Sequence, residues 1–128
     1  MVQGLMGKCL NRFFPTASHA LSKMTLRRQI KELLQQHYAD ARQKREASWH
    51  WGNCGEHVQN ATARCEQILN WQPNENLNAY FDRVLPALSA LAAHYRSDHS
   101  DADGYGLGTV RQIEQALKVK ARSYGVLC

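Results

Sequence analysis

Hydrophobic positions recur at helical spacing in the first long segment of the chain. From Leu26 they return every three or four residues through Ile30, Leu34 and Tyr38, and polar residues fill the positions between them. Residues three and four apart share one face of an α-helix, so this spacing predicts an amphipathic helix from about Leu26 to the high forties. Thr25 directly precedes the run and is a residue type that favours the N-cap.

A second helical pattern starts at Asn53. Glu56 follows three residues later, which makes a variant of the capping box with Asn in place of Ser or Thr. Apolar residues from Val58 through Cys65 continue on one face of the expected helix. Pro73 disfavours helical backbone at the residue before it, so we expect this helix to end near residue 71.

The broadest apolar stripe belongs to a third expected helix, between Leu77 and Tyr95, with Asn74 as its predicted cap. A stripe this wide is typical of a central, well-buried helix. Pro86 lies inside the stripe. An interior proline removes one hydrogen bond and clashes with the preceding turn, so we expect this helix to be kinked or broken there.

Residues 97–108 are rich in Asp and Gly, and they are interpreted as a solvated loop. Thr109 then opens a fourth helical pattern, with Gln112 completing a capping box. No period-two alternation of apolar and polar residues extends over five positions, so no strand is expected. The sequence therefore predicts an all-α fold, with about four helices in a small bundle.

Length and composition fit one globular domain, because the chain has 128 residues and 44% of them are hydrophobic. No stretch of about 18 apolar residues occurs, so no transmembrane helix is predicted. The first acidic residue is Glu32. We interpret residues 1–23 as a basic N-terminal arm or targeting segment and residues 24–128 as a single helical domain. We expect a cytoplasmic protein; the alternative is organelle targeting through the acid-free start.

The formal net charge is +5, and residues 1–23 contribute three of the cations. The remainder is only slightly basic, whereas nucleic-acid binding usually needs a denser basic stripe. Charged faces of amphipathic helices are most often simply solvated. The alternative of nucleic-acid binding nevertheless stays open through basic residues in the first and last helical segments. These are Arg27, Arg28, Lys31, Arg42, Lys44, Arg45, Lys118, Lys120 and Arg122.

Two imidazoles and a thiol lie close together in the sequence at His50, Cys54 and His57. Zinc prefers nitrogen and sulfur ligands in tetrahedral geometry, so these residues form a candidate site that lacks a fourth ligand. The favoured interpretation is that His50 and His57 are solvated and that Cys65, further along the same segment, is a small buried apolar residue. We therefore expect no cofactor and keep a small zinc-binding protein as an alternative.

Trp49 and Trp51 are the candidate partner-binding residues. Residues two apart are turned by roughly 200° on a helix, so both indoles cannot pack on the same core. Tryptophan is enriched at the residues that dominate binding energy in interfaces, and an exposed one would anchor a partner.

The sequence contains no nucleophile elbow, no EF-hand calcium loop and no phosphate-binding glycine loop. We therefore expect a small protein that is not an enzyme and acts by binding another protein, as an adaptor or regulator. The sequence is also compatible with a homo-oligomer.

Overall fold

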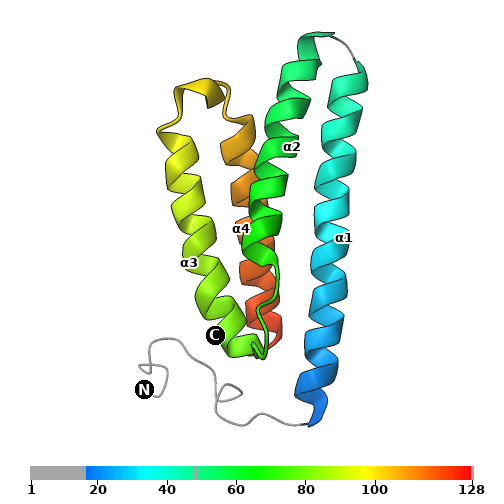
Figure 1. The fold of residues 1–128 in the computed structure, drawn as a ribbon, viewed down its shortest axis with the longest axis vertical. Helices are drawn as coiled ribbons and strands as arrows, with labels where there is room; N and C mark the ends of the chain where they lie inside the picture. The colour runs from blue at the N-terminus through cyan, green and yellow to red at the C-terminus, as the bar shows by residue number, and fades with distance from the viewer. Residues whose placement is uncertain (1–16, 48, 128) are drawn as a thin grey trace.

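The computed structural model describes the backbone of residues 17–47 and 49–127, and the side chains of residues 21–47 and 54–127. Within these ranges the chain forms four α-helices and one 3₁₀ turn, with no strand. The helices run alternately up and down (Figure 1), which confirms the predicted all-α bundle. Their bounds are α1 Ala17–Ala47, α2 Trp49–Leu69, α3 Leu77–Arg96, η3 His99–Asp101 and α4 Tyr105–Ser123.

α2 and α4 each pack against all three of the other helices. α1 packs chiefly along α2, and α3 pairs mainly with α4. The hairpin of α1 and α2 extends beyond α3 and α4 at the end where α1 passes into α2 (Figure 1). The expectation that the third helix would be central is therefore wrong. A wide apolar stripe shows that a helix is buried, but not how many helices surround it.

The core combines apolar faces from all four helices. The stripe of α3 is buried along its length, as predicted, and its Tyr80, Phe81 and Leu88 are at most 1% exposed. Leu26 from α1 and Ile113 from α4 are fully buried against the same cluster. Among residues 17–47 and 49–127, no helix is long and apolar enough to cross a membrane.

The first two helices start earlier than predicted. α1 begins at Ala17 instead of near Leu26, so Thr25 lies inside the helix rather than at its cap. α2 begins at Trp49 instead of Asn53, so Asn53 lies inside the helix rather than at its start. No proline interrupts either extension, so nothing in the local sequence stops the helix at the predicted start.

The third helix starts later than predicted, because Asn76 rather than Asn74 is its N-cap. The Asn76 side chain accepts the Ala79 backbone N–H at 2.8 Å. Asn74 instead has a φ of 60°, a left-handed conformation that asparagine tolerates in turns. Pro86 lies inside a helix that continues on both sides of it, so α3 is not broken. The kink at Pro86 stays a prediction.

The start of the fourth helix also differs from the prediction, because α4 begins at Tyr105 rather than Thr109. The Thr109 hydroxyl donates to the Tyr105 carbonyl at 2.9 Å, which is a bond within the helix. The carboxylate of Asp101 accepts the backbone N–H groups of Gly106 and Leu107 at 2.7 and 2.9 Å. Asp101 is only 7% exposed, so this part of the predicted solvated loop is instead a buried cap.

Candidate functional site

A groove of about 670 Å³ runs between the middle of α1 and the last turns of α2. Its size falls in the range of pockets that bind ligands. Nearly buried Ile30, Leu34 and Leu69 make its apolar floor, and polar and aromatic side chains make its rim. We call it the α1–α2 groove. Its lining residues are Arg27, Arg28, Ile30, Lys31, Leu34, Gln35, Tyr38, Glu66, Leu69, Asn70 and Trp71.

Trp71 lies at one end of the groove, just after α2. Its indole stacks on the ring of Tyr80, with centroids 3.7 Å apart and planes 10° from parallel. The Lys23 ammonium lies 4.8 Å from the indole centroid, and the Arg27 guanidinium lies 5.9 Å from it. These contacts are within the range of cation–π attraction. The indole is therefore held between an aromatic ring and cations, while its Nε1 is buried without a partner among the described residues.

The turn that carries Trp71 is held by an ion pair between Glu75 and Arg83. The Arg83 guanidinium also donates to the carbonyls of Ile68 and Asn70, each at 2.8 Å. Glu75 is 8% exposed, and the hydrogen bonds from Arg83 lower the pKa of its carboxyl despite the opposing effect of burial. One arginine thus joins the end of α2 to α3 and fixes the turn between them.

The N-terminal part of α1 is joined to that turn by Lys23, whose ammonium donates to the Glu75 carbonyl at 2.6 Å. Lys23 was included in the predicted N-terminal arm, but it lies within α1 and contacts the body of the domain. Nothing in the described structure tests the division into an arm and a domain. The side chains of residues 1–20 lie outside the described part of the chain.

A tyrosine–glutamate pair crosses the other end of the groove. The Tyr38 hydroxyl on α1 donates to Glu66 Oε1 on α2 at 2.6 Å. Desolvation and this hydrogen bond raise the pKa of Tyr38 to about 12, so the phenol remains protonated near neutral pH. Glu66 is the one acidic residue among those that line the groove.

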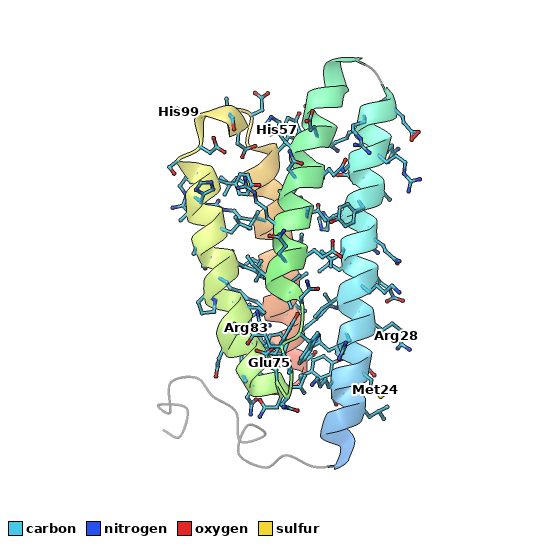
Figure 2. All side chains as sticks on the ribbon, in the orientation of Figure 1. Met24, Arg28, His57, Glu75, Arg83 and His99 are labelled. Carbon is cyan, nitrogen blue, oxygen red and sulfur yellow. The ribbon has the colours of Figure 1, made fainter. Side chains whose placement is uncertain are left out.

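Three exposed cations, Arg27, Arg28 and Lys31, follow the α1 side of the groove. None of them forms an ion pair with another residue of the described chain. Figure 2 shows Arg28 on the outer side of α1, one turn beyond Met24, which is 68% exposed. The groove therefore combines an apolar floor with a rim on which positive charge exceeds negative charge.

The other basic residues that were predicted to bind nucleic acid lie outside the groove, on two different helices. Lys44 pairs with Asp40 at 3.1 Å, and Arg45 donates to the Gln59 side chain, both at the far end of α1. About 20 Å of helix, at 1.5 Å per residue, separates that group from the cations of the groove. On α4, Lys118 pairs with Glu114 at 3.5 Å. Arg42, Lys120 and Arg122 complete the set, the last two in the final turn of α4.

Two predicted sites fall partly or wholly outside the described side chains. Trp49 and Trp51 lie in the first turn of α2, but only their backbone is described, so their role in binding stays a prediction. In the zinc alternative, Cys54 is buried and His57 is half-buried, whereas the His50 side chain is not described. No group of three potential metal ligands occurs among the described residues. The zinc site therefore also stays a prediction.

Comparisons with known proteins give no match: neither protein-family models, nor curated proteins, nor solved structures resemble the chain significantly. Sequence reasoning missed the groove, although it named the three cations. The spacing along one helix does not reveal which residues of a second helix lie opposite it.

Proposed function

We propose that this helical domain acts by binding another protein, and that the α1–α2 groove is its binding surface. The observation that carries the proposal is the combination of an apolar floor with three exposed cations that lack ion-pair partners in the described chain. Protein interfaces commonly pair an apolar centre with a polar rim, and Arg, Trp and Tyr are enriched in them. The groove contains all three residue types.

Two observations favour a protein partner over nucleic acid. Bases bind single-strand sites by stacking on open aromatic faces, but the indole of Trp71 is covered by Tyr80 and Lys23. The carboxylate of Glu66 also lies on the rim, where it would repel phosphate. Nucleic-acid binding through the basic residues remains the alternative, and the experiment must distinguish it from protein binding.

A photo-crosslinking amino acid at Gln35 tests the proposal. Gln35 is exposed and lines the groove, whereas the matched control position, Gln112, is exposed on α4 and does not line it. The full-length protein with either substitution is expressed in cells and irradiated, and crosslinked proteins are identified by mass spectrometry. We expect a partner that crosslinks from Gln35 only, and that binds the purified domain directly in a saturable titration.

The proposal is wrong if position 35 crosslinks to no protein that binds the purified domain. It is also wrong if the purified domain instead binds an oligonucleotide with a steep salt dependence that Lys31→Glu weakens, because that behaviour indicates phosphate neutralisation. Trp49→Ala and Trp51→Ala, measured against the same partner, determine whether the second predicted surface contributes to the interface.

A further inference from the structure

We infer that the α1–α2 groove receives an acidic amphipathic helix of its partner. This inference rests on the proposed function and adds the chemistry of the bound segment. It follows from the backbone of the groove walls, from the length of the groove and from the charge along its rim.

The walls of the groove favour a helical occupant over an extended one. Both walls are α-helices, α1 and α2, whose interior backbone N–H and C=O groups bond within their own helix. An extended peptide usually binds by adding a strand to a sheet edge, and the described chain has no strand to offer. A helix needs no backbone partner, and it binds by laying its apolar face into a groove.

The length of the groove suits about three turns of helix. Its lining on α1 extends from Arg27 to Tyr38, which corresponds to about 16 Å at a rise of 1.5 Å per residue. Ile30 and Leu34 lie one turn apart on its floor, with Leu69 of α2 beside them. Apolar side chains spaced three and four residues apart on the partner helix would meet this floor in register.

The charge of the rim defines the polar face of that helix. Arg27, Arg28 and Lys31 supply three positive charges within about one turn of α1, against the single carboxylate of Glu66. That carboxylate already accepts the hydrogen bond of Tyr38. Complementary potentials accelerate association and exclude partners of the wrong sign. A helix with glutamates beside its apolar face fits the rim, whereas a basic helix would be repelled.

Synthetic peptides test the inference directly. The probe is a fluorescein-labelled peptide of about 18 residues, or five turns, with leucines on one face and glutamates elsewhere. One control contains the same residues in an order that leaves the leucines on no common face, and the other has lysine in place of glutamate. Binding to the full chain is followed by fluorescence anisotropy at physiological salt.

We expect the acidic amphipathic peptide to bind at least about tenfold more tightly than either control, because both charge and apolar register contribute. Arg28→Glu and Lys31→Glu should each weaken binding by about threefold to tenfold. Arg111→Glu reverses an equal charge at an exposed position of α4 outside the groove, and it should change the affinity less than twofold. Equal binding of the three peptides, or equal effects of Lys31→Glu and Arg111→Glu, would overturn the inference.

The crosslinked product from Gln35 separates this inference from the proposed function. If the crosslinked segment of the partner is acidic and helical, both stand. If it is basic or extended, the inference is wrong while protein binding at the groove stands. If no directly binding protein crosslinks from position 35, the proposed function itself is wrong.

Discussion

Glu75 and Arg83 meet in a two-point ion pair across the turn between α2 and α3. Arg83 Nε lies 2.7 Å from Glu75 Oε2, and one terminal nitrogen lies 2.9 Å from Oε1. Two parallel hydrogen bonds fix both side chains more firmly than a single charge contact. Because the same guanidinium binds the carbonyls of Ile68 and Asn70, this pair positions the turn that presents Trp71 to the groove.

We predict that Glu75→Gln lowers the free energy of unfolding at pH 7 by about 1–3 kcal/mol, because it leaves Arg83 without its charged partner. The pKa of Glu75 lies below its ordinary value of 4.5, chiefly through its hydrogen bonds with Arg83. A depressed pKa contributes stability that is complete above the unfolded value and is lost as the pH falls through the folded value.

The stability of the native sequence should therefore decrease below about pH 4.5 more steeply than that of Glu75→Gln. Urea denaturation at a series of pH values measures both curves. Glu32→Gln removes an exposed carboxylate from α1 and serves as the control. Parallel pH curves for the native sequence and Glu75→Gln would contradict the prediction.

We predict that Asp101→Ala costs about 1–2 kcal/mol, because the backbone N–H groups of Gly106 and Leu107 lose their shared acceptor at the start of α4. Asp103→Ala, in the same turn but exposed, should cost less than about 0.5 kcal/mol. Thermal unfolding followed by circular dichroism compares the two. Similar losses would mean that the Asp101 cap does not stabilise α4.

We predict opposite effects for two helical glycines. A Cβ added at Gly55 of α2 would lie 2.6 Å from the Ala41 carbonyl oxygen of α1, so Gly55→Ala should destabilise the protein by about 1–3 kcal/mol. A Cβ at Gly108 of α4 meets nothing within 4 Å, and Gly108→Ala should stabilise by about 0.5–1 kcal/mol. Chemical denaturation measures both. A neutral Gly55→Ala would show that α1 and α2 separate easily at this point.

We predict that Cys65 reacts slowly with alkylating reagents while the protein is folded. Its side chain is fully buried, and burial raises the pKa of its thiol to about 12, so almost no thiolate exists at neutral pH. Pulse labelling with iodoacetamide, read by mass spectrometry of the Cys65 peptide, should give a much faster reaction in denaturant. Equal rates in the folded and unfolded protein would contradict the burial of this thiol.

The helical periods could be predicted from the sequence because they are local. Leu26, Ile30 and Leu34 follow the 3.6-residue repeat that places them on one face, and all three are buried. Leu88 and Tyr95, in the apolar stripe of α3, were likewise predicted to face the core, and both are buried. Amphipathic spacing by itself thus determined the fold class and much of the core.

The helix ends were predicted less well, because capping depends on contacts that a local pattern does not contain. Asp101 caps α4 from outside the predicted capping box, and Lys23 contacts a carbonyl more than fifty residues away in the chain. The sequence gives the polar residue type at such positions, but the cap forms only where the folded chain brings the donor groups to it.

The sequence by itself determined that Arg27, Arg28 and Lys31 lie close together, since residues within one turn of a helix are neighbours whatever the rest of the chain does. Only the tertiary structure decided that they border a groove. That arrangement requires α2 to lie antiparallel beside α1, with Glu66 and Trp71 opposite the cations. At the other end of the same helix pair, the close approach of α2 to α1 requires a small residue, Gly55, against the backbone of α1. Contacts between distant segments, rather than helical periodicity, created the candidate site.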